Sequence, residues 1–490
     1  MTVTAVQTQT EQNFKRAPIV AIMLIGAFVG LLNETLLTTA LPHIMNDFNV
    51  SENSVQWLTT VYLLTNGIML PISAFLIVKF STRNLFMTSM ILFIIGTVIA
   101  ALSQSFGVLL VARIVQAAGS GVMMPLMMNV FLRIFPEDKR GAAMGLSGIV
   151  ISFAPAIGPS LSGWLVENYD WRSLFYIVLP IAVLVVIFAF VYMKNVIPLT
   201  RPKIDMLSIL TSSVGFGGLL YGFSNAGSKG WGSPYVYLSL IVGGLVLIFF
   251  IWRQLSMKSP LLEFRVFKIG TFALTICLSM VVLTSLIGAE TMLPLYMQNM
   301  RHFSAFDSGL MMLPGAIILG IMSPIIGMVF DKIGAKWLAV AGLAITALGT
   351  LPFVFLDQST SFAFLSIMYA VRMFGLAMAM MPIFADGLNQ LPQSMHPHGT
   401  AMLNTLQQVS SSIGTAVLFT VMSNVTKHQL TSGHTSNMIQ ANIHGVNVSF
   451  IVVVCLAAVS IVMAFFLRSR NFKKQENDAK ESQAVPATEN

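Results

Sequence analysis

Long apolar stretches recur along the whole chain, each about 20 residues long and each followed by a short polar segment. Because a helix rises about 1.5 Å per residue, about 20 apolar residues cross the hydrocarbon core of a bilayer. The pattern therefore predicts about fourteen membrane-spanning helices. We expect them at 18–40, 55–78, 85–104, 107–131, 142–166, 172–193, 207–225, 235–252, 271–298, 306–330, 337–356, 361–385, 400–424 and 447–467.

The composition agrees with an integral membrane protein. Of the 490 residues, 56% are hydrophobic and 9% are charged, whereas a soluble domain has about 25% charged residues. The net charge of +8 comes from cations scattered between the apolar stretches, which argues against a nucleic-acid partner. Both cysteines lie within apolar stretches, so we expect neither a disulfide framework nor a cysteine metal site.

Lysine and arginine are concentrated in alternate loops. The loops after the second, fourth, sixth, eighth and tenth predicted helices carry most of them, and the opposite loops carry few. By the positive-inside rule we expect both termini on the cytoplasmic side of the membrane. Residues 1–17 are then a cytoplasmic segment, and the charged tail 468–490 is predicted to be cytoplasmic and disordered.

A glutamate, Glu34, stands deep inside the first predicted helix, among leucines. A carboxylate in hydrocarbon costs several kcal/mol unless it is paired or neutral, and ionisable side chains inside a membrane commonly line transport pathways. Glu34 is therefore the leading candidate for proton handling. The alternative is a structural ion pair or hydrogen bond.

Several residues recur in the second half of the chain. Glu34 of the first helix returns as Glu290 in the ninth, each followed by threonine. Arg113 of the fourth helix returns as Arg372 in the twelfth, and both of these helices end in Met-Met-Pro. Internal repeats of this kind are typical of secondary transporters, whose sites lie between the halves. We expect two six-helix halves, at 18–193 and 270–467, with two inserted helices and their linkers between them at 194–269. The terminal segments are then 1–17 and 468–490.

The fifth predicted helix is rich in glycine and proline, with Gly148, Pro155, Gly158, Pro159 and Gly163. Small residues let helix backbones approach closely, and proline bends a helix. The run is therefore typical of any kinked, closely packed helix. It also resembles the antiporter signature of the major facilitator superfamily, a Gly-Pro pair followed by glycine in the fifth helix. The resemblance implies export by exchange rather than uptake.

Two further stretches resemble motifs of the fourteen-span drug/proton antiporters in this superfamily. The surroundings of Arg113 are similar to the family's arginine motif, which is linked there to proton coupling. This charge needs an acceptor such as Glu34 or Asn33, or else it reaches the membrane surface. In the first helix, Asn33 stands where the family has aspartate. Since one residue is about 100° around a helix, either Glu34 reaches the same cavity or Glu290 is the alternative or second proton carrier.

A loop motif of the superfamily, roughly Gly-x-x-x-Asp-Arg-x-Gly-Arg, has two counterparts here. The first is degenerate, because it keeps Lys79 and Arg83 but has Val78 at the acidic position. The second keeps Asp331 and Lys332. In the family this loop latches helix ends, so the resemblance implies an asymmetric gating latch. The alternative for Asp331 and Lys332 is a solvated pair worth under about 1 kcal/mol.

Polar side chains on apolar helices are candidates for a substrate cavity. Besides Asn33 and the two glutamates, we name Gln298 of the ninth helix and, in the thirteenth, Asn404 and Gln407. Methionine can form adaptable walls, although most of the 32 methionines must be core or lipid-facing. Asp386, near the end of the twelfth helix, is expected at the surface.

The sequence contains neither a phosphate-binding loop nor a His-Glu-x-x-His zinc motif, so we predict neither an enzyme nor an ATP-driven pump. The resemblance covers about residues 18–467 and implies an all-α major facilitator fold of fourteen helices. It implies a bacterial cell-membrane antiporter that exports lipophilic, often cationic compounds against protons by alternating access. The alternative is a transporter of one specific metabolite or nutrient with the same fold. We expect a monomer whose partners are small molecules, protons and lipid, with no cofactor beyond the coupling proton.

Overall fold

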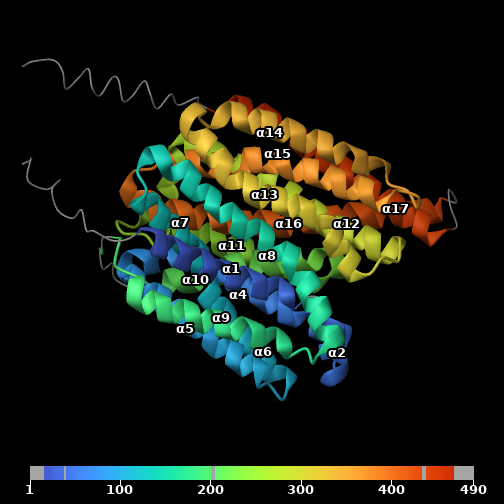
Figure 1. The fold of residues 1–490 in the computed structure, drawn as a ribbon, viewed down its shortest axis with the longest axis horizontal. Helices are drawn as coiled ribbons and strands as arrows, with labels where there is room; N and C mark the ends of the chain where they lie inside the picture. Colours follow the sequence, from blue (N-terminus) through green and yellow to red (C-terminus); the bar gives the residue numbers. More distant parts are fainter. Residues whose placement is uncertain (1–15, 38–39, 198, 200–204, 433–436, 468–490) are drawn as a thin grey trace, which may run out of the picture.

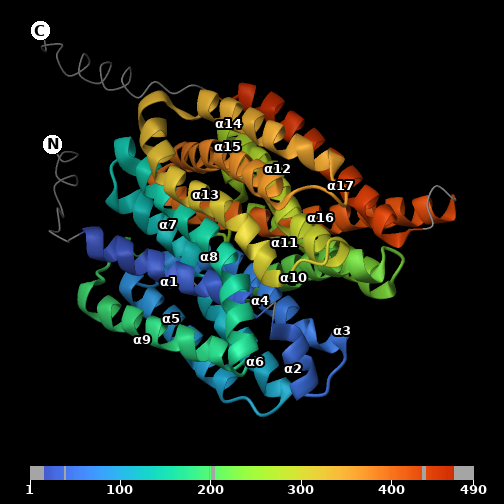
Figure 2. The ribbon, with the colours of Figure 1, turned by 45° about the vertical axis from the view of Figure 1, so that its right-hand side comes forward.

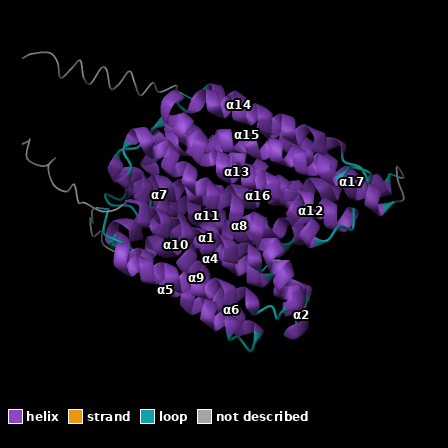
Figure 3. Cartoon of the chain, viewed as in Figure 1, coloured by secondary structure: helices purple, strands orange, loops and turns teal. Residues whose placement is uncertain are grey.

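The computed structural model describes residues 16–37, 40–197, 199, 205–432 and 437–467. Within these ranges the regular structure is entirely helical (Figure 3). Fourteen helices in the described part are long and apolar enough to cross a membrane, as predicted. The predicted tail 468–490, and all of the predicted segment 1–17 except its last two residues, lie outside the described residues.

Among the described residues, the first half of the chain and the inserted pair contain eleven α-helices. They are α1 (Arg16–Leu36), α2 (Leu41–Asp47), α3 (Glu52–Val55), α4 (Trp57–Lys79), α5 (Thr82–Ala101), α6 (Phe106–Ser120), α7 (Met123–Ile134), α8 (Arg140–Asn168), α9 (Ser173–Tyr192), α10 (Met206–Lys229) and α11 (Pro234–Ser256). The second half contributes α12 (Gly270–Leu295), α13 (Ala305–Ile333), α14 (Ala335–Thr350), α15 (Phe362–Asn389), α16 (His396–Thr431) and α17 (Met438–Phe465).

Two helices differ from the predicted spans in ways that the structure explains. The fourth span is divided into α6 and α7 at Gly121, whose backbone lies against α4: a Cβ there would be 2.8 Å from the Asn66 side chain. The last helix begins at Met438 rather than at residue 447. Its first two turns carry polar side chains and precede the apolar stretch, so the hydrophobic pattern does not include them. Hydropathy locates the part of a helix inside the membrane and does not report helical turns outside it.

The two halves lie side by side, with α1 and α4–α9 on one side and α12–α17 on the other (Figures 1 and 2). The start of α1 and the end of α17 lie at the same end of the bundle, as an even number of crossings requires. We call this the terminal end and the other the opposite end.

The halves meet along the antiparallel pair α8 and α13. Gly141 faces Gly327 near the terminal end, and Gly145 faces Ser323 one turn further along. A Cβ on Gly145 would be 2.7 Å from the Cα of Pro324, and one on Gly327 would be 2.9 Å from the Cα of Ala142. The glycines of α8 therefore let the backbones of the two halves touch.

A substitution along α8 tests this contact. Gly145→Ala is expected to lower the melting temperature of the purified protein by a few degrees, because overpacking costs about 1–3 kcal/mol and the neighbouring atoms are backbone. Gly163→Ala, on the same helix, is the control: nothing lies within 4 Å of its Cβ position. Equal melting temperatures for the two variants in detergent would contradict the proposed close contact.

The inserted helices α10 and α11 cover the other seam between the halves, where α4 meets α16. The ring of Tyr221 on α10 stacks on Trp57 of α4, with centroids 5.7 Å apart. Trp231, which follows α10, donates from its indole nitrogen to the hydroxyl of Thr420 on α16 at 2.8 Å. The pair therefore contacts both halves at once, and α11 turns most of its surface away from the bundle, towards lipid.

Candidate functional site

A cavity of about 270 Å³ lies between the two halves and contains both glutamates. Glu34 reaches it from α1 and Glu290 from α12, and both side chains are half-buried. Asn404 and Gln407 of α16 also line it, so four of the six predicted cavity residues meet there. The volume is close to the lower end of ordinary ligand pockets, about 300–1,000 Å³.

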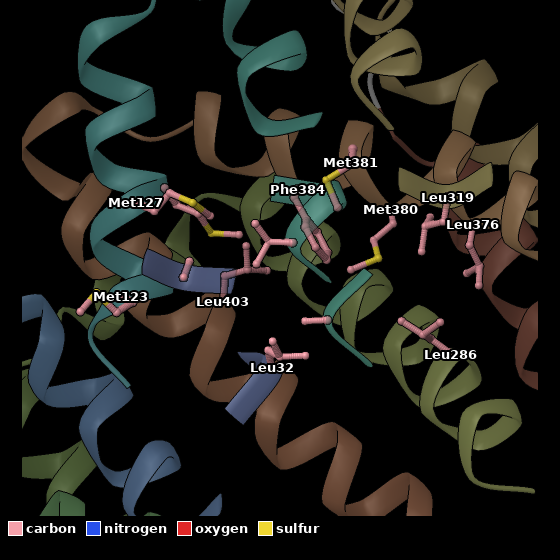
Figure 4. Close-up of a cluster of buried hydrophobic side chains, with 14 of the residues drawn as sticks. Leu32, Met123, Met127, Leu286, Leu319, Leu376, Met380, Met381, Phe384 and Leu403 are labelled. Atoms are coloured by element: carbon pink, nitrogen blue, oxygen red, sulfur yellow. The ribbon is translucent and has the colours of Figure 1, made fainter. Parts of the chain in front are cut away.

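The rest of this central cavity is mainly apolar. Met123, Leu286 and Met380 belong to its wall and to a cluster of buried side chains contributed by several helices of both halves (Figure 4). Because methionine is flexible and polarisable, such a wall adapts to differently shaped apolar ligands. The cavity thus combines two carboxyl groups with a mainly apolar, deformable lining.

Glu34 is held in place by its neighbours on two other helices. The amide nitrogen of Asn66 on α4 donates to its carboxylate at 3.4 Å. The adjacent Thr35 donates its hydroxyl to the carbonyl of Ala154 on α8 at 3.3 Å. This approach depends on Gly158, where a Cβ would be 2.8 Å from the Cβ of Thr35. A glycine of the antiporter-like motif therefore packs directly beside the Glu34 site.

Arg113 lies fully buried between α1, α4 and α6 and does not reach the membrane surface. Its guanidinium donates to the backbone carbonyl of Asn33 at 3.3 Å and to that of Leu58 at 3.3 Å, and it stacks 4.0 Å from the ring centroid of Tyr62. It interacts electrostatically with Glu34, but within the described residues the two form no ion pair within 4.0 Å. Asn33 thus supplies the acceptor through its backbone. Its side chain is buried and does not line the central cavity.

The second half repeats this arrangement around Arg372, which is also fully buried. Its guanidinium donates to the backbone carbonyl of Ser285 on α12, and to the hydroxyl of Thr350 on α14 at 3.1 Å. It interacts electrostatically with Glu290. In each half, therefore, an arginine on the fourth helix is bound to a carbonyl of the first helix, close to that helix's glutamate.

Two Gly-Thr pairs that we did not single out from the sequence complete these arginine sites. Thr97 on α5 accepts a hydrogen bond at 2.9 Å from Gln116, which itself accepts one from Arg113 at 3.1 Å. The preceding glycine, Gly96, lies against the backbone of Gln116. Gly349, which precedes Thr350, lies against Arg372 in the same way: a Cβ on Gly349 would be 2.7 Å from the backbone nitrogen of Arg372. In the sequence these residues form a Gly-Thr repeat in the third and eleventh predicted helices, which could have indicated the two arginine sites.

Gln298 does not line the central cavity. It belongs to a π-helical turn after α12, Tyr296–Met300, and lines a second cavity of about 520 Å³. This outer cavity lies towards the opposite end of the bundle, between α8 and the α12–α13 pair, and Pro155 and Pro159 form one wall. Glu290 lines both cavities, whereas Glu34 lines the central one.

The two copies of the loop motif behave differently. The carboxylate of Asp331 accepts hydrogen bonds from the backbone nitrogens of Gly141 at 2.8 Å and Ala142 at 3.0 Å, and so caps α8 across the two halves. Lys332 is exposed. In the first copy, Arg83 donates to the Phe190 carbonyl at 2.6 Å and Lys79 lies 5.0 Å from the Phe75 ring, both within one half.

Removing the Asp331 cap should loosen the start of α8. Because a lost cap costs about 1 kcal/mol, Asp331→Ala is expected to speed amide exchange at Gly141 and Ala142 about fivefold. Lys332→Ala serves as the control, since that side chain is exposed at the same helix end. Hydrogen–deuterium exchange read by mass spectrometry over residues 140–145 distinguishes them. Unchanged exchange in Asp331→Ala would mean that the cap does not hold these helices together.

Further hydrogen bonds join the halves at the terminal end. Arg140 donates to Asn389 at 3.2 Å, and Asn129 donates to Thr400. The expectation for Asp386 was wrong: it is 3% exposed, because α15 continues for almost a turn beyond it. Among the described residues no three His, Cys, Asp or Glu side chains come together as metal ligands would.

Comparison with known proteins agrees with this architecture. The family model of the Major Facilitator Superfamily matches residues 23–415. The MFS-type transporter YcnB of Bacillus subtilis is 54% identical over 474 residues, which cover 96% of this chain and all of the relative. The lincomycin resistance protein LmrB of the same organism is 44% identical over 467 residues, covering 94% of this chain and 97% of the relative.

Two solved structures share the fold. The human organic anion transporter MFSD10 superposes with a TM-score of 0.61 at 14% identity, over 90% of this chain and 99% of that protein. The proton:xylose symporter XylE gives a TM-score of 0.61 at 15% identity, over 94% and 98%. The fold and the family implied by the sequence motifs are thereby confirmed. On the family match, the extent of the similarity to these relatives and the fourteen-helix architecture, the chain belongs to the major facilitator superfamily of membrane transporters.

Proposed function

We propose that this transporter is a proton-driven exporter of lipophilic, often cationic small molecules. The observation that carries the proposal is the central cavity, in which one glutamate from the first helix of each half faces a mainly apolar space whose wall includes Met123, Met124 and Met380. Relatives support the substrate class: LmrB is named for lincomycin resistance, and a Mycobacterium tuberculosis relative, 27% identical over 399 residues, is named multidrug resistance protein Stp. The site is built within a single chain, which supports a monomer.

The chemistry follows from competition for the carboxyl groups. A carboxylate in an apolar cavity attracts either a proton or an organic cation, and binding of one disfavours the other. Protonation makes the site neutral, so the empty transporter can pass through a closed state without moving a bare charge through low dielectric. Release of the proton then prepares the site for the next cation. This exchange would drive export by the proton gradient.

The end connections fit alternating access. By the positive-inside rule the terminal end is cytoplasmic, and there the Asp331 cap and the Arg140–Asn389 hydrogen bond join the halves. These bonds must break when the cavity opens to the cytoplasm. They are few, and a hydrogen bond to a charged group contributes about 1.5–3 kcal/mol, so breaking them costs a modest free energy.

The test uses purified protein in proteoliposomes with an imposed pH gradient. A fluorescent lipophilic cation and the internal pH are followed together. We expect gradient-driven movement of the cation with protons flowing the opposite way, and no movement without the gradient. Absence of both fluxes for several unrelated lipophilic cations would reject the proposal and favour a transporter specific for one metabolite.

A further inference from the structure

We propose that the two glutamates have different tasks: Glu290 takes up the proton, which reaches it through the outer cavity, and Glu34 binds the cation of the substrate. This inference rests on the proposed function. It starts from the position of the cavities, because Glu290 lines both the central and the outer cavity and Glu34 lines the central one.

The outer cavity extends from Glu290 towards the opposite end of the bundle. Gln298, eight residues further along the chain, is about 12 Å closer to that end by the helical rise and lines the same cavity. Ser308, near the start of α13, lines it as well, as does Pro42, which follows α1. With its volume of about 520 Å³, the cavity is large enough for a file of water molecules between Glu290 and that end.

Two prolines supply acceptors for this water. Proline has no N–H, so the carbonyl four residues before it lacks its usual helical donor. Pro159 thereby frees the carbonyl of Pro155, and Pro294 frees the carbonyl of Glu290 itself. Both Pro155 and Glu290 line the outer cavity. Freed carbonyls inside a membrane are satisfied by water or neighbouring groups. They therefore mark a hydrated route that ends at Glu290.

The surroundings of the two carboxylates also favour Glu290 as the proton acceptor and Glu34 as the cation site. Glu34 already accepts a hydrogen bond from Asn66. Glu290 accepts none from the described residues, and its charged or titratable neighbours are Arg372 and Tyr369 on α15. The walls that α8 and α13 contribute to the outer cavity carry no charge. Glu290 is thus open to a proton from water in the outer cavity, whereas Glu34, held by Asn66, lines the central cavity and not the outer one.

Two carboxamide variants separate the tasks in proteoliposomes. Glu290→Gln is expected to abolish proton-driven transport, while exchange of internal for external cation, which needs no net proton movement, stays within about threefold of wild type. Glu34→Gln is expected to lose cation binding and both kinds of transport. The opposite assignment, with cation exchange lost in Glu290→Gln and kept in Glu34→Gln, would overturn the inference.

Blocking the outer cavity tests the route without touching either glutamate. Met312→Cys places a thiol in its wall, and Phe306→Cys, which is 53% exposed on the same helix and does not line the cavity, is the matched control. Both are made in a Cys277→Ala, Cys455→Ala background. A bulky, membrane-impermeant thiol reagent added outside should slow proton-driven transport at least tenfold in Met312→Cys alone, with cation binding unchanged.

The outcomes are distinguishable from failure of the proposed function. If wild-type protein does not couple cation and proton fluxes, the proposed function itself is wrong. If wild type couples the fluxes but Glu290→Gln still couples them, or if the reagent acts equally on both cysteine variants, only the division of tasks is wrong.

Discussion

Glu34→Gln should reduce gradient-driven export of a lipophilic cation at least 100-fold. The side chain faces the central cavity and keeps its position through Asn66. Glutamine has nearly the same shape, so the cavity remains but loses the charge that attracts the substrate. Loss of one buried, charge-paired contact commonly costs about 3 kcal/mol or more, which corresponds to a factor of about 150 or more. Equilibrium binding in detergent and initial rates in proteoliposomes measure the loss.

The matched control for this prediction is Asn404→Ala, which removes a polar side chain from the wall of the same cavity without removing a carboxyl group. We expect at most a tenfold change in export for this variant, because a neutral hydrogen bond contributes about 1 kcal/mol. Full coupled transport by correctly folded Glu34→Gln would show that the carboxyl group is not needed.

The lengths of the apolar stretches were sufficient to locate the membrane-spanning helices, but they did not define where each helix begins and ends. The span around Arg113 was predicted as one continuous helix, but Gly121 interrupts it where it crosses α4. Similarly, α17 starts nine residues before the apolar stretch that predicts it. Both differences depend on tertiary contacts or on helical turns outside the bilayer, which hydropathy does not encode.

The repeat of Glu-Thr and Arg located the site, because a duplicated fold brings equivalent positions to the centre. It did not show what each side chain faces. Asn33 and Glu34 are adjacent in sequence, yet the side chain of Asn33 is buried away from the central cavity and that of Glu34 lines it. Likewise, the partner of Asp331 is the start of α8, 190 residues away. Such pairings follow from how helices of different halves pack, and one sequence carries no direct record of them.

The second large effect is expected for Arg113→Gln, which should strengthen cation binding but slow turnover. The guanidinium is fully buried and interacts electrostatically with Glu34. Two charges that are near each other without forming an ion pair interact by about 1–2 kcal/mol at an effective dielectric of about 20. Removing the positive charge should therefore tighten cation binding at Glu34 by about fivefold to thirtyfold. Turnover should fall at least tenfold, because a more tightly held cation leaves more slowly and because the Asn33 and Leu58 carbonyls lose their donor.

Arg372→Gln is the internal control, since this buried arginine also donates to a carbonyl of the first helix of its half and interacts with Glu290 instead of Glu34. If Glu34 binds the cation, Arg372→Gln should leave cation affinity within about twofold and act on proton-driven transport alone. Titration of each variant with a fluorescent cation, on protein that elutes as a single symmetric peak, gives the affinities. Tighter binding in Arg372→Gln than in Arg113→Gln would place the cation beside Glu290 and reverse the roles of the two halves.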